Sequence, residues 1–149
     1  MPAPILITYF SNKTEKEHRD AGVMAYFSAR NSTCAVEGAI IVAINKETNT
    51  IIHVSVAAGP CRARRAGDAV VYTGEDSVYN AHVIPLMSLR RVSIPLGEVA
   101  RVCGIPSGDK AKSNIQKCTQ FPYLTTPFYK GEHADAILAA YTVYIRGLA

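Results

Sequence analysis

The sequence predicts an α+β fold, a small and strongly curved β-sheet or barrel with helices packed beside it. Three observations lead to this prediction. The chain opens with the apolar run Ile5–Phe10, which passes directly into a short, highly charged segment. Residues 38–59 form two β-rich runs around the polar stretch 46–49, which is the pattern of a β-hairpin. Near the end, residues 132–147 carry apolar side chains at helical spacing.

The first strand and the helix after it have recognisable boundaries. We expect a strand over residues 5–10 and a helix over roughly residues 13–20. Asn12 is the expected N-cap of this helix, with Glu15 three residues later as its capping-box partner, because an Asn side chain can accept a hydrogen bond from a free N–H group of the first turn. Gly22 is the expected end of the helix.

The middle of the chain predicts further strands before the late helix. Residues 60–68 (PCRARRAGD) are basic and bounded by Gly and Pro, which indicates a loop. Short strands are expected over residues 69–73, 79–87 and 92–96, the last of them interrupted by Pro95. The late helix is predicted from a stripe of apolar residues, namely Ala134, Ile137, Leu138, Tyr141 and Ile145.

Length and composition fit a single globular domain over residues 1–149. Of the 149 residues 48% are hydrophobic, which is enough for one core. The formal net charge of +4 permits an anionic partner such as nucleic acid but is too small to require one. No apolar run is long enough to span a membrane and no leader pattern precedes the first strand, so we expect a soluble, cytoplasmic protein.

The sequence contains no pattern that predicts catalysis, a metal or a cofactor. The four cysteines and four histidines show no metal-ligand spacing. The sequence also lacks a phosphate-binding glycine loop, a nucleophile elbow and a His-Glu-x-x-His helix. We therefore expect a binding module rather than an enzyme. The alternatives are a small RNA- or DNA-processing enzyme or accessory domain without a recognisable catalytic motif, and an interaction scaffold.

Basic residues form three groups along the chain, which makes them candidates for contacts with phosphate. The first group lies in the loop over residues 60–68, the second is the pair at residues 90–91, and the third is a Lys-rich stretch that begins at residue 110. If the fold brings these groups together, they form a face for a nucleic-acid backbone; otherwise they are solvated loop surface. The predicted phosphate-binding residues are Arg62, Arg64, Arg65, Lys112 and Lys117.

The order of the motifs resembles the YTH and EVE domains of the PUA-like superfamily. The run ILITYFSN, a short charged helix, the stretch AGVMAY and the hairpin EGAIIVAINKETNTIIHVSVAAG follow one another as they do in that family. The resemblance continues through residues 81–99 (AHVIPLMSLRRVSIPLGEV) and 112–141. It therefore spans nearly the whole chain and implies a PUA-like fold.

The resemblance also implies recognition of a modified, methylated base in DNA or RNA. Such domains flip the base into a pocket with aromatic walls and read its edge with polar groups. Some are N-terminal targeting modules of modification-dependent restriction enzymes of the McrB type, so a fused or associated nuclease or NTPase is an expected partner. In the matching motifs, Ser11 and Asn12 occupy edge-reading positions, Met24 the position of a Trp wall, and Lys117 lies near a phosphate-binding residue.

The chain departs from the family in having no tryptophan, so other side chains must line the pocket. The available replacements are Tyr26 or Phe27 beside Met24, with Tyr72 or Tyr79 opposite. Stacking on such flat side chains contributes about 1–3 kcal/mol per base, and a Met thioether makes soft contacts with rings. The expected base-binding set therefore combines these residues with the polar residues of the first helix.

Each of these residues also has a structural alternative. Met24 and Phe27 could be core residues that hold a loop against the sheet. Ser11 and Asn12 could do no more than cap the helix. Tyr72 and Tyr79 lie in or next to expected strands, where Tyr is common without any binding role.

Overall fold

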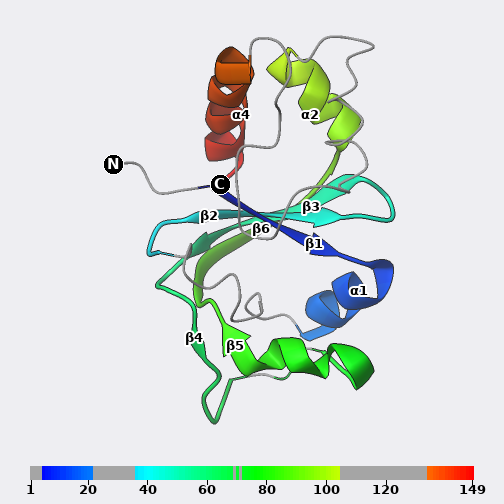
Figure 1. Cartoon of the computed structure of the whole chain (residues 1–149), viewed down its shortest axis with the longest axis vertical. Helices are drawn as coiled ribbons and strands as arrows, with labels where there is room; N and C mark the ends of the chain where they lie inside the picture. The colour runs from blue at the N-terminus through cyan, green and yellow to red at the C-terminus, as the bar shows by residue number, and fades with distance from the viewer. Residues whose placement is uncertain (1–4, 22–35, 69, 71, 105–133) are drawn as a thin grey trace.

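The computed structural model describes residues 5–21, 36–68, 70, 72–104 and 134–149. Their elements in chain order are β1 (Ile5–Phe10), α1 (Asn12–Ala21), β2 (Ile40–Asn45), β3 (Thr50–Ala57), β4 (Arg62–Ala63), the 3₁₀-helical segment η2 (Gly74–Ala81), β5 (His82–Val83), β6 (Leu86–Pro95), α2 (Leu96–Cys103) and α4 (Ala134–Leu148). Figure 1 shows a central layer of strands with helices on both sides, so the predicted α+β class is confirmed. None of the helices in these ranges is both long and apolar enough to cross a membrane.

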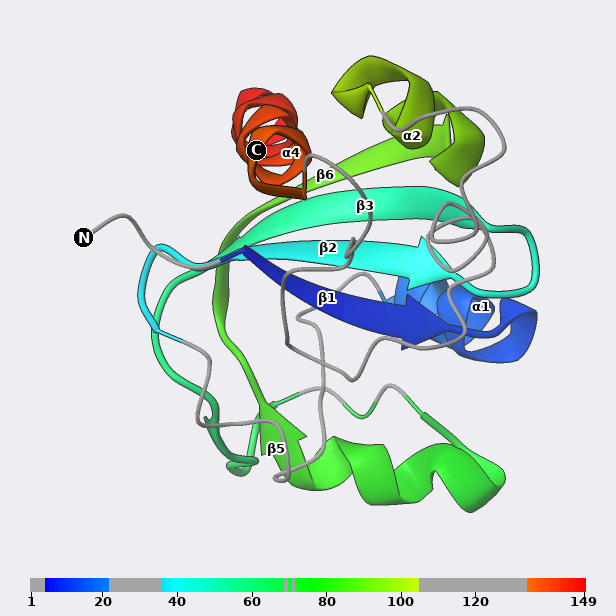
Figure 2. The same cartoon turned by 45° about the horizontal axis from the view of Figure 1, so that its top comes forward.

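A four-stranded mixed sheet, in the order β1-β2-β3-β6, forms the centre of the fold. Strands β1 and β2 are parallel, with Ile5 opposite Ile40, whereas β2 and β3, and β3 and β6, are antiparallel pairs. The β2–β3 pair confirms the predicted hairpin around residues 46–49. Strand β6 bends along the sheet, but β1 and β6 remain separate edges (Figure 2). The sheet is therefore open and does not close into the barrel that was one of the two expected forms.

Helices α2 and α4 cover one face of the sheet and enclose the larger apolar core with it (Figure 1). Ile137, Tyr141 and Ile145 are spaced four residues apart on α4, so they form one stripe, and all three are buried. Leu96 and Val99 of α2 belong to the same buried cluster. The prediction that the late helix packs beside the sheet is confirmed.

Helix α1, the β4–β5 pair and η2 lie on the opposite side of the sheet (Figure 1). Two smaller apolar clusters fill this side, one around Ile41 and one around Phe10 and Val83. The buried surface here is more polar than on the α2–α4 side. Thr8 and His53 are buried opposite Ala43 in the sheet, and Ser55 is buried two residues farther along β3; these polar side chains share the face of Ala43.

Strand β3 contains a β-bulge that changes which of its side chains face α1. The consecutive β2 residues Ala43 and Ile44 pair with His53 and Ile51. Ile52 therefore has no partner on β2 and is the extra residue of the bulge. Ile51 and Val54 point into the α2–α4 core, whereas Ile52 packs against the cluster on the α1 side. The bulge therefore places two consecutive side chains, Ile52 and His53, on the face that carries α1.

The predicted strands over residues 69–73 and 79–87 are wrong for most of the described residues. Tyr72 and Thr73 have no strand pairing, and residues 74–81 form η2. The Asn80 side chain explains this difference, because its amide accepts a hydrogen bond from the Tyr72 N–H (3.0 Å) and donates one to the Tyr72 carbonyl (2.8 Å). These two bonds satisfy the backbone groups that a strand neighbour would have paired.

The predicted short strand over residues 92–96 is the end of a longer one. Strand β6 runs unbroken to Pro95, which is tolerated because β6 is an edge strand. Helix α2 then begins at Leu96 and was not predicted. The predicted loop over residues 60–68 is confirmed except for the two-residue strand β4, which pairs with β5.

Helix α1 begins at Asn12, so its N-cap is Ser11 and the predicted cap at Asn12 is wrong. The Ser11 Oγ accepts a hydrogen bond from the Thr14 N–H (3.2 Å), and the Thr14 Oγ1 accepts one from the Ser11 N–H (2.8 Å). This is a reciprocal capping box with Thr in the place of the expected Glu15. The helix ends at Ala21, and the predicted stop at Gly22 lies outside the described residues.

Candidate functional site

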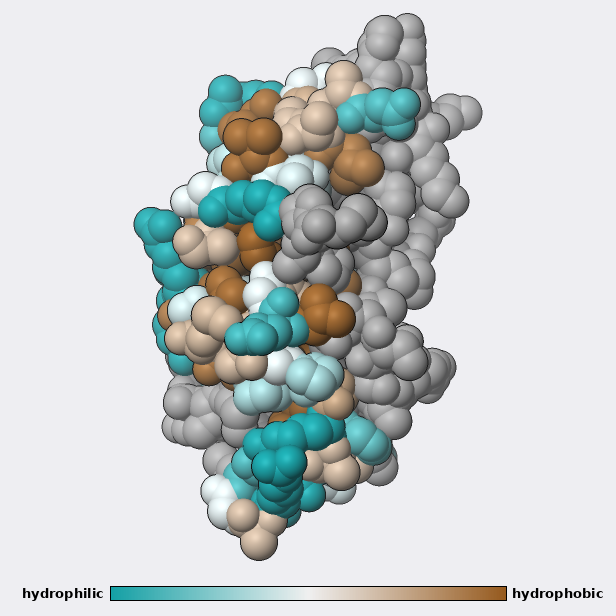
Figure 3. Space-filling model, turned by 90° about the vertical axis from the view of Figure 1, so that its left-hand side faces the viewer, coloured by the Kyte–Doolittle hydropathy of each residue, from teal (hydrophilic) through white to brown (hydrophobic). Residues whose placement is uncertain are grey.

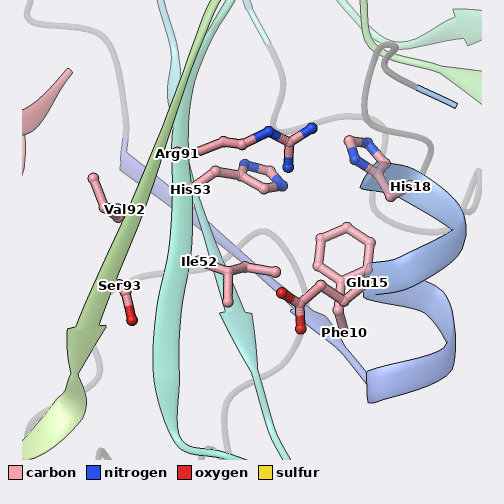
Figure 4. A pocket seen from close by; sticks show the side chains of 8 residues that line it. All are labelled: Phe10, Glu15, His18, Ile52, His53, Arg91, Val92 and Ser93. Carbon is pink, nitrogen blue, oxygen red and sulfur yellow. The ribbon is translucent and has the colours of Figure 1, made fainter. Parts of the chain in front are cut away.

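A cavity of about 180 Å³ lies on the α1 side of the sheet, between α1 and the strands β3 and β6 (Figure 4). Its walls combine aromatic rings, aliphatic side chains and a few polar groups. The lining residues are Phe10, Glu15, His18, Ile52, His53, Arg91, Val92 and Ser93. They come from four elements, the consecutive β1 and α1 and the more distant strands β3 and β6, so the cavity depends on the tertiary fold.

The local structure explains how each element reaches the cavity. Phe10 is the last residue of β1, and His18 lies two turns into α1, which begins directly after it. The bulge in β3 turns His53 toward the same side. His53 is opposite Arg91 in the β3–β6 register, which brings an arginine from the edge strand to the cavity.

Three rings form one wall of the cavity. The rings of His18 and His53 are stacked, with centroids 5.3 Å apart and an interplanar angle of 18°. The Phe10 ring is tilted against both, at centroid distances of 5.3 Å from His18 and 5.8 Å from His53. All three side chains are buried. The wall therefore combines two stacked imidazoles with a phenyl ring tilted by about 50° to them, and it offers apolar ring faces as well as ring nitrogens.

His53 has two buried ring nitrogens and no hydrogen-bond partner among the described residues. Burial, and after it the neighbouring His18 and Arg91, lower the pKa of His53 from 6.5 to about 3. The imidazole is therefore neutral at pH 7 and offers one N–H donor and one acceptor nitrogen. Leaving buried donors and acceptors unpaired costs about 1–3 kcal/mol each, so this position is unfavourable unless water or a ligand satisfies it.

The remaining polar lining residues differ in whether they are engaged. The Glu15 carboxylate accepts a hydrogen bond from the Asn45 amide (2.5 Å), which ties α1 to the sheet. Arg91 and Ser93 are exposed and lie on β6, two residues apart. Neither side chain forms a hydrogen bond or ion pair with a described residue. Figure 4 shows the Arg91 guanidinium lying alongside the His53 ring.

Ser11 and Asn12 lie at the junction of β1 and α1, next to Phe10 in the chain. The Ser11 hydroxyl is engaged with Thr14 in the cap. Asn12 is exposed; its side-chain oxygen Oδ1 accepts a hydrogen bond from the Asn45 side-chain amide (2.9 Å), and its backbone N–H donates to the Glu47 carboxylate (2.5 Å). Both residues thus have structural roles at the edge of the cavity wall, and base reading by them stays a prediction.

Of the residues predicted to form the aromatic walls, Tyr72 is the one whose side chain the structure describes. Tyr72 is buried and packs with Phe10 and Val83, so its ring is part of the core on the α1 side and does not line the cavity. Tyr79 belongs to η2, but its side chain lies outside the described residues. The remaining predictions that lie outside them are Met24, Tyr26, Phe27, Lys112 and Lys117.

The basic loop around β4 is organised by Asp68. Arg62 donates two hydrogen bonds to its carboxylate (2.8 and 3.2 Å), the Arg65 N–H donates a third (2.7 Å), and Arg64 binds the Asp68 carbonyl (2.6 Å). The hydrogen bonds from Arg62 and Arg65 lower the pKa of Asp68 to about 2. Arg62 is therefore paired with an acid, whereas Arg64 and Arg65 remain exposed and keep a positive surface.

The hydrophilic side chains gather at the lower end of one side of the molecule, over the β4 loop (Figure 3). Apolar side chains are more frequent toward the α4 end of the same side.

Within the described ranges no group of three or more His, Cys, Asp or Glu side chains is placed to hold a metal ion.

No protein-family model matches the chain, and no curated protein matches it. The function must therefore be argued from the geometry. Sequence reasoning missed His18, His53 and Ser93 as site residues, and it noted Arg91 as a member of a basic pair without including it in the predicted phosphate-binding set. One signal was available, because the doublet Ile51–Ile52 breaks the alternation of β3 directly before a buried polar residue.

Proposed function

We propose that the chain is a nucleic-acid-binding module that recognises a methylated base by taking it, flipped from its stack, into the cavity beside α1. This function follows the resemblance to the PUA-like YTH and EVE domains. The observation that carries it is the ring wall of Phe10, His18 and His53 with its unpartnered neutral imidazole. In a modification-dependent restriction system, such a module would direct a fused or associated nuclease or NTPase to modified sites.

The size of the cavity favours a single ring system. Its volume of about 180 Å³ is below the roughly 300 Å³ at which pockets for drug-sized ligands and cofactors begin. Stacking a base on an aromatic side chain contributes about 1–3 kcal/mol. Flipping a base from a duplex costs a few kcal/mol, so stacking on one ring and one or two hydrogen bonds are of the right order to offset it.

The polar groups of the cavity match the edge of a base. His53 offers a donor and an acceptor, and both could bond a base edge because neither has a hydrogen-bond partner among the described residues. Ile52 provides an aliphatic contact for a methyl group, whereas the Val92 side chain points to the other face of β6 and packs against the α2–α4 core. A methyl placed against Ile52 gains about 0.8 kcal/mol from burial, which is the size of effect on which recognition of a methylated base must rest.

The experiment fills the cavity and measures base selectivity. In Ile52→Phe the larger ring would occupy the space of the ligand, while the matched control Met87→Phe adds the same ring at an exposed position on β6. Anisotropy titrations would use DNA and RNA oligonucleotides with methylated adenine, methylated cytosine or no modification. We expect Ile52→Phe to lose the preference for a modified base and Met87→Phe to keep it. Equal affinities of the unaltered protein for all oligonucleotides would refute the proposal.

The alternative is a small nucleic-acid-processing enzyme that uses the two histidines as acid and base. The pair His18–His53 beside Arg91 favours this function, because such groups can move protons and stabilise an anion. The low pKa of His53 speaks against it, since a general base works best with a pKa near the working pH. Incubating the oligonucleotides with the protein and analysing their length and base composition separates the two functions.

A further inference from the structure

The mouth of the cavity is formed by strand β6. Among the eight lining residues, Arg91 and Ser93 are the exposed ones, and the others are buried or half-buried. Both lie on β6, an edge strand of the sheet, and because they are two residues apart their side chains lie on the same face. A ligand whose ring reaches the wall of Phe10, His18 and His53 must therefore leave its remaining atoms beside these two side chains.

We propose that Arg91, together with the Ser93 hydroxyl, binds a phosphate group next to the flipped base. This inference rests on the proposed function. Because the cavity has room for one ring system, the sugar and phosphate of a flipped nucleotide would stay at the mouth. A guanidinium offers paired N–H donors that match phosphate oxygens, and a hydroxyl offers one more donor.

The guanidinium of Arg91, like that of Arg65 in the β4 loop, forms no hydrogen bond or ion pair with a described residue, whereas those of three other arginines do. Arg62 is paired with Asp68, Arg64 with the Asp68 carbonyl, and Arg90 donates to the Leu148 carbonyl (3.3 Å). Arg91 was not among the phosphate-binding residues predicted from the sequence. A guanidinium that bonds no described residue and lies at the rim of a concave site is a ready position for an anion.

The titratable side chains that line the cavity with Arg91 come from two elements. Helix α1 contributes His18 and Glu15, and strand β3 contributes the neutral His53. Glu15 already accepts a hydrogen bond from Asn45, which directs its carboxylate toward the sheet. Burial is the main cause of the lowered pKa of His53, and the positive charge of Arg91 contributes to it. The positive charge of Arg91 therefore acts on the cavity. A phosphate at the mouth would partly neutralise this charge.

The test compares Arg91→Gln with Arg90→Gln. Both changes remove one positive charge from the same strand, but Arg90 binds the Leu148 carbonyl and does not line the cavity. Oligonucleotide affinity would be measured over a salt series. We expect Arg91→Gln to weaken binding about tenfold or more and to lower the salt slope by about one unit, equally for modified and unmodified oligonucleotides. Arg90→Gln should change the salt slope by much less than one unit.

A second measurement uses the methylated nucleoside and the same nucleoside carrying one phosphate. The phosphorylated form should bind the unaltered protein more tightly, and Arg91→Gln should remove that advantage while nucleoside binding persists. Inorganic phosphate at matched ionic strength should not displace the nucleotide. Displacement by inorganic phosphate at low concentration would overturn the inference, because the site would then hold free phosphate.

The outcomes separate the two proposals. If oligonucleotides bind with base selectivity but Arg91→Gln and Arg90→Gln behave alike, the role of Arg91 is overturned and the base pocket stands. If no oligonucleotide binds the unaltered protein even at low salt, the proposed function fails and the phosphate site fails with it. A melting temperature close to that of the unaltered protein confirms that Arg91→Gln is folded.

Discussion

His53 links the stability of the protein to pH. The pKa of His53 is lowered to about 3 in the folded protein, whereas in the unfolded chain it returns to its ordinary value near 6.5. Between these values the unfolded state binds more protons, so stability is lost as the pH falls. We expect this residue alone to lower the free energy of unfolding by about 2 kcal/mol between pH 7 and pH 5. Denaturant titrations at several pH values measure this effect.

His53→Leu tests the origin of that pH dependence. The substitution removes the titrating group and both unpaired ring nitrogens, so the stability curve should flatten below pH 6.5. His82→Leu is the control, because it removes a histidine from the half-buried strand β5. It should leave the steep dependence in place. A slope unchanged by His53→Leu would contradict the assignment of this titration to His53.

The capping box of α1 gives a second prediction about single residues. Ser11→Ala removes the acceptor for the Thr14 N–H and should cost about 1 kcal/mol of stability. Asn12→Ala leaves this cap intact but removes the acceptor for the Asn45 amide. If Asn12 also reads a base edge, its substitution should lower selectivity for the modified oligonucleotide, which Ser11→Ala should not do. Thermal melts and titrations of the two variants measure both effects.

Individual site residues were harder to predict than the elements that carry them. His18 reads as a polar helix residue and His53 as an interruption of an apolar strand, and nothing in their spacing connects them. They meet because Ile52 is an extra residue in β3, and the pairing of β3 with β2 and β6 defines that bulge. Long-range pairing of this kind is not encoded in a local pattern.

The side chain of Asn45 on β2 connects this strand to α1 and to the hairpin turn. We therefore expect its removal to cost more stability than the removal of a helix cap. Its side-chain Nδ2 donates to Asn12 and Glu15 on α1, and its side-chain Oδ1 accepts from the N–H groups of Glu47 and Thr48 in the hairpin turn. Asn45 is buried, so Asn45→Ala leaves several polar groups unpaired and should cost about 2–3 kcal/mol. Amide exchange should increase in both α1 and the turn.

Asn45→Asp is the sharper control for this connection. It keeps the shape of the side chain but replaces the donating amide with a carboxylate that faces Glu15. At neutral pH the two negative charges should repel, and lowering the pH should recover stability as one carboxyl becomes protonated. Recovery at low pH for Asp but not for Ala would confirm that the amide joins the helix to the sheet.

Helix α4 supplies a matched pair of substitutions on its two faces. Ile145 is 0% exposed in the core, whereas Val143, two residues earlier, is 73% exposed. Ile145→Ala should cost about 2–5 kcal/mol because it removes buried volume, and Val143→Ala should stay within about 0.5 kcal/mol of the unaltered protein. Chemical denaturation measures both. Similar losses in the two variants would place Val143 in a buried contact.

Elements with a strong local signal were predicted and those without one were not. The β2–β3 hairpin and α4 follow from periodicity and turn composition, and both are confirmed. Helix α2 was missed although Leu96, Val99, Ala100 and Cys103 repeat at helical spacing and Gly104 ends the helix with φ of 78°. Pro95 before it was interpreted as a break in a strand, which hid the start of a helix.

The distribution of charge over the whole molecule predicts how salt affects nucleic-acid binding. Arg64 and Arg65 are exposed in the β4 loop on the α1 side of the sheet, whereas Arg101 is paired with Glu98 on α2. Changing Arg64 and Arg65 together to Gln should lower the salt slope by about two units for modified and unmodified oligonucleotides alike. Arg101→Gln, on the other side of the sheet, is the control and should leave the slope unchanged.

The parallel pairing of β1 with β2 has a consequence for synthesis of the chain on the ribosome. Strand β1 leaves the ribosome before its partner among the described strands, β2, which begins at Ile40. Until then the uncharged segment ILITYF has no neighbour, and it combines high β-propensity with the absence of Pro and Gly, as aggregation-prone segments do. Chains that stop before the hairpin should therefore aggregate or be bound by chaperones, and completion of β2 marks the point at which this strand becomes protected.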